Sequence, residues 1–323
     1  MPVPPPPTPG LISLVIPVFN ERDSLRQLVT EIDAVSKTLA ERVEVVFVDD
    51  GSTDGSWGEI RQLANSDERV RGLRFRRNFG KAAALQAGFA EARGETVFTL
   101  DADLQDDPAE IPDFLAALRA GKDVVSGYKK TRHDPWHKVF PSRVFNWLVS
   151  TATGVKLHDH NCGYKAYRVE VVREVKLYGE LHRFVPVLAA AKGFRVGERV
   201  VNHRPRTFGK SKYGWRRFVK GFLDLWSVRL VTSFGWRPMH FLGALGLLLM
   251  VLGCGVGSGS LALLVGVGGW GGGWNVVLSL GTLGGAVAVV LGGQAIFTGF
   301  VAEAVAARRT DEPFVVSERT DAD

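Results

Sequence analysis

The chain has 323 residues and a formal net charge of +6. This length allows one α/β core of roughly 200 residues, with chain left over for membrane segments. The two cysteines, Cys162 and Cys254, lie in different regions, which excludes a disulfide framework. The basic residues gather beside an uncharged stretch, so we expect a membrane surface and phosphate-bearing substrates as partners, and no nucleic acid.

The first half of the chain alternates predicted strands and helices. Residues 1–10 are Pro-rich and expected to be disordered, without the charged and apolar regions of a secretory signal. Helical spacing predicts helices at Ser24–Leu39, capped by Ser24, and at Gly80–Ala92. Apolar runs rich in β-branched residues predict three buried parallel strands, at Leu11–Val18, Val43–Val48 and Thr96–Leu100. This alternation predicts a Rossmann-like α/β domain over residues 11–213, with an open, mostly parallel sheet.

The pattern becomes less regular after Asp113. Short strands around Val124 and Lys165 and a helix at Val139–Val149 predict the half of the domain that faces a second substrate. Residues 214–237 then alternate basic positions with aromatic and aliphatic ones, which is typical of interfacial amphipathic helices. An ordinary core-facing helix is the alternative.

A long uncharged stretch follows, because no Asp, Glu, Lys or Arg occurs between Arg237 and Glu303. It predicts two transmembrane helices within residues 238–302, at about 241–267 and 276–302, joined by the turn GGWGGGWN. Lys and Arg flank the outer ends of this hairpin, so the positive-inside rule predicts a multi-pass protein of the inner or cell membrane. The α/β domain and the tail 303–323 would then be cytoplasmic. Two buried helices of a soluble domain are the alternative, and the glycines of the spans would permit a homo-oligomer.

Each predicted parallel strand ends in a polar cluster: PVFNE (residues 17–21), VDDGSTDGS (48–56) and LDADLQDDP (100–108). Carboxyl ends of parallel strands meet at one sheet edge, where ligands bind. Asp101 and Asp103, with Gln105 nearby, can present the oxygen ligands that Mg²⁺ or Mn²⁺ prefers. Such an ion would bridge the phosphates of a nucleotide diphosphate. Asp49, Asp50 and Glu21 can then accept hydrogen bonds from the nucleoside.

These motifs resemble the family 2 glycosyltransferases of the GT-A fold, particularly the polyprenyl phosphate sugar transferases of the dolichyl-phosphate mannose synthase type. The resemblance spans about residues 11–215 and also includes RNFGKAAALQAGF and a late RTFGKSKY, which points to lipid-phosphate acceptors. It implies inverting transfer of a hexose from a nucleotide sugar to a polyprenyl phosphate. The donor stays open between a UDP-hexose, GDP-mannose and UDP-linked modified sugars.

The resemblance also implies roles for individual residues. A divalent metal would be bound by Asp101, Asp103 and Gln105, and the nucleotide by Pro17, Asn20, Glu21, Asp50 and, less directly, Asp49. The lipid phosphate would be approached by Lys129, Arg132 and Arg143. A loop with Arg206, Ser211 and Lys212 would close over the donor, so that Asp103, Arg206 and Lys212 act in catalysis. Asp159 would face the active site, with Glu180 and His182 as supporting groups.

Other functions fit the sequence less well. His158, His160 and Cys162 alternate as zinc ligands on a strand would, but a fourth ligand is missing. A processive polysaccharide synthase of the same fold would carry a Q-x-x-R-W segment and more spans. An NAD-dependent oxidoreductase would carry G-x-G-x-x-G after the first strand, where PVFNE stands. A non-catalytic membrane scaffold is the alternative from another class, and the three acidic clusters argue against it.

Overall fold

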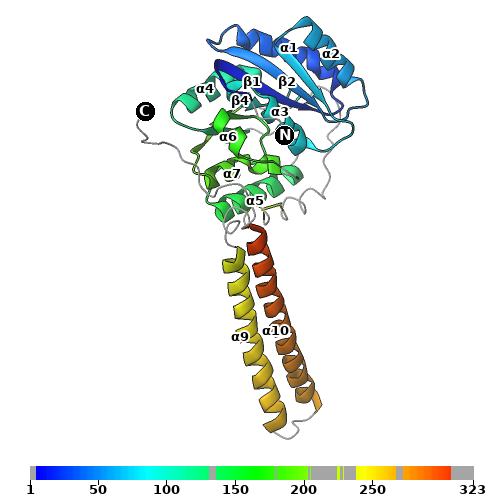
Figure 1. Ribbon diagram of the computed structural model, residues 1–323, viewed down its shortest axis with the longest axis vertical. Helices are drawn as coiled ribbons and strands as arrows, with labels where there is room; N and C mark the ends of the chain where they lie inside the picture. Colours follow the sequence, from blue (N-terminus) through cyan, green and yellow to red (C-terminus); the bar gives the residue numbers. More distant parts are fainter. Residues whose placement is uncertain are drawn as a thin grey trace. The chain divides into compact units, whose positions relative to one another are not determined.

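The computed structural model describes residues 5–130, 136–177, 179, 181–202, 204, 224–225, 228, 238–266 and 272–306. The chain divides into two compact units, residues 1–228 and 229–323. The first unit is built on a seven-stranded sheet in the order β3-β2-β1-β4-β6-β5-β7. Its strands are β1 (Thr8–Val18), β2 (Arg42–Asp49), β3 (Val70–Arg74), β4 (Gly94–Thr99), β5 (Val124–Tyr128), β6 (Lys165–Arg168) and β7 (Val196–Val200). Figure 1 shows β1, β2 and β4 of this sheet with helices around them.

The sheet is mostly parallel, as predicted. Strands β1 to β4 run parallel to one another, and β5 runs parallel to β7. Only β6, among the described strands, is antiparallel to its neighbours. Strands β1 and β2 are buried over most of their length because helices cover both faces of the sheet, which explains their nearly continuous apolar sequence.

Helices form a layer on each face of the sheet. One layer packs on Ile12, Leu14 and Ile16 of β1 and contains α1 (Arg22–Ser36), α2 (Ser56–Ser66) and α4 (Ile111–Arg119). The other packs on Val15 of β1 and Val97 of β4 and contains α3 (Lys81–Glu91), α6 (Val169–Glu174) and α7 (Val185–Ala191). Alternate residues of β1 therefore serve two separate cores. The remaining elements of this unit are α5 (Trp136–Thr153) and the 3₁₀ turns η1 (Pro108–Glu110) and η2 (Leu181–Phe184).

Several local predictions need correction. Strand β1 begins at Thr8, inside the segment expected to be disordered, because the Thr8 amide donates to the Arg93 carbonyl at 2.7 Å. Ser24 does not cap α1; it lies in the first turn, where its hydroxyl donates to the Glu21 carbonyl. Several short elements were missed, among them the helices α2, α4, α6 and α7 and the strands β3 and β7. The two missed strands have five residues each and carry arginines, so the apolar signal is weak.

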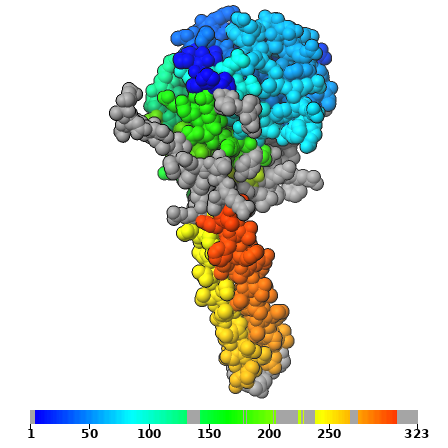
Figure 2. All heavy atoms as spheres, in the orientation of Figure 1, coloured from blue at the N-terminus to red at the C-terminus, as the bar shows by residue number. Residues whose placement is uncertain are grey.

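The second unit is a helical hairpin of α9 (Pro238–Gly266) and α10 (Gly272–Ala306), which lie side by side along their length (Figure 2). Glycines permit this contact: a Cβ atom at Gly253 would lie 2.6 Å from the Gly285 carbonyl oxygen, and one at Gly246 would lie 2.5 Å from that of Gly292. Such close approach of small residues is typical of membrane helices.

Both helices are long and apolar enough to cross a membrane, over Pro238–Gly266 and Trp274–Val305. Few residues of their apolar windows are buried, 6% and 11%, so neither is a core helix of a soluble domain. The molecule therefore associates with a membrane. Within the stretch 214–237, the structure describes only Asp224, Leu225 and Val228. Leu225 and Val228 are buried in one apolar cluster with Phe184, which agrees with the alternative of a core-facing helix.

Candidate active site

The polar loops after β1 and β2 are joined by hydrogen bonds. The Asn20 side-chain oxygen accepts from the Thr53 amide at 2.8 Å, and the Asn20 amide donates to the Ser52 hydroxyl at 2.9 Å. The Glu21 amide donates to Ser56 Oγ at 3.1 Å. Asn20 adopts a positive φ of 55°, a conformation that Asn tolerates better than most residues. The motifs PVFNE and VDDGSTDGS therefore form one connected rim, and Pro17 lies beneath it in β1, beside Val48 of β2.

The carboxylates of Asp49 and Asp50 bind the protein itself. Asp49 is fully buried; its Oδ1 accepts from the Ser52 amide at 3.0 Å. Asp50 accepts from the backbone amides of Phe79 at 2.6 Å and Gly80 at 2.9 Å. Burial raises the pKa of Asp50, although these two N–H groups oppose the shift. Both residues thus hold the loops in place, and nucleotide binding by their side chains stays a prediction.

The third cluster follows β4 in an unusual backbone conformation. Leu104, between Asp103 and Gln105, has a φ of 62° and a buried side chain, and a bulky residue with positive φ is rare. The turn is held by the Asp101 amide, which donates to Asp106 Oδ2 at 3.2 Å, and by the Gln105 amide, which donates to Asp103 Oδ1 at 3.2 Å. The burial of Leu104 anchors the turn, so Asp101, Asp103 and Gln105 are kept together at the sheet edge.

Asp101 forms an ion pair with Lys81, the first residue of α3. Burial raises the pKa of the Asp101 carboxyl, but the Lys81 ammonium, with smaller contributions from Lys129 and His182, outweighs burial and holds that pKa at about 2. Asp101 is therefore ionised at any physiological pH. A supporting role for His182 stays a prediction, and Glu180 lies outside the described residues.

Gly163 packs directly against the Asp101 carboxylate. A Cβ atom at this position would lie 2.7 Å from Asp101 Oδ2, which is closer than real Cβ contacts allow. The Gly163 carbonyl accepts from the Thr99 hydroxyl at 2.7 Å, which fixes the glycine beside β4. The absence of a side chain at Gly163 therefore leaves room for the acidic motif.

Lys129 and Arg143, expected to approach a lipid phosphate, have different surroundings. Lys129 is 15% exposed, and its ammonium lies 3.1 Å from Oδ1 of the buried Asp106. Burial lowers the pKa of Lys129, but the charge of Asp106 outweighs this and raises it above the ordinary value, so the side chain stays cationic. Arg143 is exposed on α5. The other expected basic and loop positions, Arg132, Arg206, Ser211 and Lys212, lie outside the described residues.

Arg204 was not singled out from the sequence, yet it ties the segment after β7 to the acidic motif. Its amide donates to the Gln105 carbonyl at 3.1 Å, and its own carbonyl accepts from Gln105 Nε2 at 3.3 Å. Its guanidinium pairs with Glu31 at 2.6 Å and Asp107 at 2.7 Å. Arg204 stands two residues before Arg206 in the chain, and the predicted closing loop itself lies outside the described residues.

Glu198 of β7 is a second residue that the sequence did not reveal. One of its oxygens accepts from the backbone amides of His158 at 2.8 Å and Asp159 at 3.1 Å, and the other lies 2.6 Å from His158 Nδ1. The His158 ring stacks on Tyr128 with centroids 4.8 Å apart. Glu198 therefore fixes the segment that carries Asp159, whose buried carboxylate accepts from the Asn161 amide.

The zinc alternative at His158, His160 and Cys162 does not hold. His158 pairs with Glu198, and His160 is buried with Nε2 3.0 Å from Ser150 Oγ. Cys162 is itself buried, and burial raises the pKa of its thiol to about 12. Across the described part of the chain, no three His, Cys, Asp or Glu residues gather as a metal site.

The described acidic motif can still contribute to a metal site that a substrate completes. Mg²⁺ is commonly held by one or two carboxylates together with substrate phosphates. Asp101, Asp103 and Gln105 supply two carboxylates and one amide, all hard oxygen donors, so the donor set fits an ion shared with a diphosphate. Lys81 and such an ion would compete for the Asp101 carboxylate.

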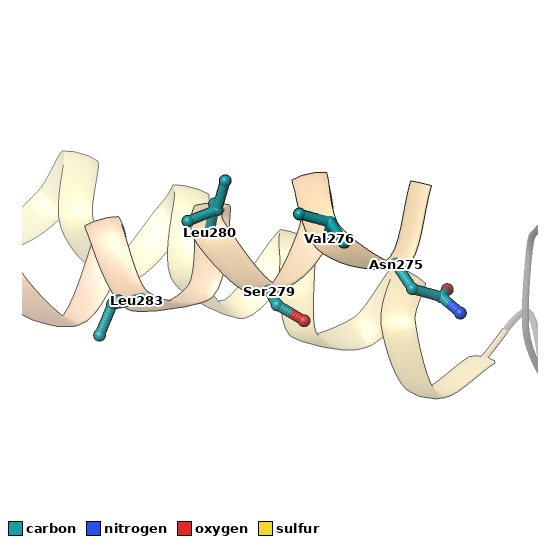
Figure 3. A pocket seen from close by; sticks show the side chains of 5 residues that line it. All are labelled: Asn275, Val276, Ser279, Leu280 and Leu283. Carbon is teal, nitrogen blue, oxygen red and sulfur yellow. The ribbon is translucent and has the colours of Figure 1, made fainter. Parts of the chain in front are cut away.

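A shallow hollow on α10 is lined by Asn275, Val276, Ser279, Leu280 and Leu283 (Figure 3). It has no charged side chain among its lining residues, so it offers nothing to bind a diphosphate or a metal ion. It lies on one of the two apolar helices that are long enough to cross a membrane.

A family model and two relatives identify the family. The model described as glycosyl transferase family 2 matches residues 13–176. The chain is 42% identical over 246 residues to dodecaprenyl-phosphate galacturonate synthase of Rhizobium johnstonii, covering 75% of this chain and 73% of that protein. It is 37% identical over 244 residues to undecaprenyl-phosphate 4-deoxy-4-formamido-L-arabinose transferase of Aeromonas hydrophila, with the same coverage.

Solved structures agree in fold. Glucosyl-3-phosphoglycerate synthase of Mycobacterium tuberculosis, in complex with Mg²⁺ and uridine diphosphate, aligns with a TM-score of 0.52 and 18% identity, covering 69% of this chain and 79% of that chain. Identity at this level shows a shared fold alone. The family model and the two relatives show more than the fold: the chain belongs to glycosyl transferase family 2.

Proposed function

We propose that this protein transfers a hexose from a nucleotide diphosphate sugar to a polyprenyl phosphate, with inversion at the anomeric carbon. The observation that carries the proposal is the similarity to two polyprenyl-phosphate sugar transferases over 75% of the chain. A membrane-associated hairpin in the same chain supports a lipid acceptor. The product would be a polyprenyl-phosphate-linked monosaccharide.

The chemistry explains why cations and carboxylates dominate the site. A phosphate oxygen of the acceptor forms a bond to the anomeric carbon while the bond from that carbon to the nucleotide diphosphate breaks. The acceptor is already anionic near neutral pH, so a strong general base is unnecessary. Positioning and charge stabilisation should dominate instead.

A divalent ion, Mg²⁺ or Mn²⁺, would neutralise charge that develops on the leaving diphosphate. Asp101, Asp103 and Gln105 would hold it, with Asp103 as the residue most critical for catalysis. Their shared turn, anchored by buried Leu104, supports this assignment. The rim of Asn20 and Glu21, above Pro17, would receive the nucleotide, with Asp49 and Asp50 supporting it.

Basic residues would bind the acceptor. Lys129 is cationic and lies near Asp101, whose pKa it lowers, which supports a role close to the reacting phosphates. Arg143, and by prediction Arg132, would extend the basic surface toward the lipid phosphate. Arg206, Ser211 and Lys212 would close over the donor from the segment that Arg204 anchors. Asp159 would complete the acceptor side.

The orientation follows from charge. Under the positive-inside rule, the arginines before α9 and after α10 support a cytoplasmic location for both ends of the hairpin and hence for the catalytic domain. The chain would then cross the membrane twice.

The test is transfer of radiolabelled sugar to undecaprenyl phosphate by detergent-solubilised protein, from a panel of UDP- and GDP-linked sugars that includes UDP-galacturonate. We expect lipid-linked product from one donor with Mn²⁺, none with EDTA, and a loss of at least about 10²-fold in Asp103→Ala. Asp113→Ala removes an exposed carboxylate of α4 and should act as wild type. A folded protein that makes no product from any donor would favour the membrane scaffold instead.

A further inference from the structure

The ion pair between Lys81 and Asp101 joins α3 to the acidic motif and was not foreseen from the sequence. Both side chains are partly open to solvent, at 28% and 31% exposed. A ligand can therefore reach the pair at the sheet edge. Lys81 therefore lies beside the carboxylate of Asp101, to which we assign metal binding.

The backbone of Lys81 is fixed by its surroundings. The Asp50 carboxylate accepts from the amides of Phe79 and Gly80, the two residues that precede Lys81. Gly80 has a φ of 95°, which turns the chain into α3 and is readily adopted by glycine. Buried Ala82 then packs α3 on the sheet. A change of partner by Lys81 therefore requires only rotation of its side chain.

The neighbouring basic side chains have partners outside the metal-binding pair. Lys129 pairs with Asp106, which is 1% exposed. Lys165 is buried and donates to a backbone carbonyl, and Arg204 pairs with two other carboxylates. Of these four described side chains, Lys81 is the one whose charged group forms an ion pair with a predicted metal ligand. Its partner, Asp101, is also the carboxylate that a bound divalent ion would contact.

We propose that Lys81 is a donor-binding residue whose ammonium holds Asp101 in the free protein and moves to the diphosphate of the sugar donor when Asp101 binds the divalent ion. This inference rests on the proposed function. Two cations at one carboxylate oxygen repel each other, whereas a diphosphate offers several strong acceptors for an ammonium group. The negative charge of Asp101 is then balanced by Lys81 in the free protein and by the divalent ion in the donor complex.

Lys81→Met tests this exchange because methionine keeps an unbranched side chain and removes the charge. Without the competing ammonium, Mn²⁺ alone should bind the variant about twofold to fivefold more tightly. Without the phosphate contact, UDP in the presence of Mn²⁺ should bind about tenfold more weakly. Lys81→Arg, which retains the charge, should restore most of the UDP affinity. Lys37→Met is the matched control, since Lys37 forms an exposed ion pair with Asp33 on α1.

The measurement uses full-length protein in detergent. Free Mn²⁺ is followed by electron paramagnetic resonance without nucleotide, and UDP and GDP binding by calorimetry with Mn²⁺. Opposite changes of the two affinities in Lys81→Met support the exchange. Equal affinities in wild type and variant, or a loss of both, would overturn it, while wild-type sugar transfer in the same preparation leaves the proposed function standing. If the wild type binds neither nucleotide and transfers no sugar, both proposals fail.

Discussion

The tight contact between Gly163 and Asp101 makes Gly163→Ala a sharp test of the acidic motif. The added Cβ would lie 2.7 Å from Oδ2, 3.0 Å from Cγ and 3.1 Å from Oδ1 of Asp101. Ordinary van der Waals contact begins at 3.4 Å, so the carboxylate must move by 3.4 minus 2.7, about 0.7 Å. A misplacement of about 1 Å can reduce an enzymatic rate about 10²-fold, so we expect kcat/KM to fall about 10- to 100-fold.

The variant should stay folded, because Asp101 is partly exposed and can swing away; the cost in stability should be about 1 kcal/mol, the low end for overpacking. Sugar transfer and thermal unfolding are measured on the same preparations. Gly58→Ala is the control, since no heavy atom lies within 4 Å of its added Cβ in α2. Transfer by Gly163→Ala within twofold of wild type would refute the reasoning, and so would an activity loss explained entirely by unfolded protein.

Three further predictions concern other parts of the molecule. Glu198→Gln should weaken the hydrogen bonds that Glu198 accepts from the His158 and Asp159 amides. We expect the KM for the lipid to rise about threefold to tenfold while UDP binding stays unchanged. An unchanged KM for the lipid would contradict a role of Glu198 in positioning Asp159. Burial and the charge of Lys165 lower the pKa of His160 to about 4. Between about pH 6.5 and 4 the unfolded chain therefore binds more protons at this residue than the folded chain does. The free energy of unfolding should fall by up to about 3 kcal/mol as the pH falls across that range. Thermal unfolding from pH 7.5 to 4.5 should show a smaller decline in His160→Gln, and equal slopes would contradict the argument. Gly285→Val should separate the hairpin, because a Cβ there would lie 2.5 Å from the Gly253 oxygen. Gly284→Val is the control, because a Cβ at Gly284 would meet no atom of another segment within 4 Å. Equal thermal stability of the two variants in detergent would count against tight packing.

The sequence was sufficient for the features that local pattern decides. Continuous β-branched runs predicted β1, β2 and β4, and an uncharged stretch predicted α9 and α10, because burial in a parallel sheet or in lipid selects apolar residues over a whole segment. Polar residues after each strand predicted the edge of the sheet where the motifs meet, since parallel strands end together. The short strands β3 and β7 gave too few apolar residues to be recognised.

The tertiary structure decided what the polar residues do. Sequence reasoning treated Asp49 and Asp50 as nucleotide ligands, and the structure adds that both hold backbone amides. The sequence shows two adjacent aspartates whether they bind the nucleotide or hold backbone amides. Such a distinction depends on which groups the fold brings within hydrogen-bonding distance, and turn residues serve both purposes.

Lys81, Gly163 and Glu198 were invisible to sequence reasoning for one physical reason. Each acts on a residue distant in the chain: Lys81 on Asp101, Gly163 on the same carboxylate and Glu198 on the segment at His158. Helical and strand periodicity report only which face of an element is buried. The sequence by itself determined the α/β architecture, the acidic edge and the apolar hairpin, while only packing across the sheet decided which side chains hold that edge in place.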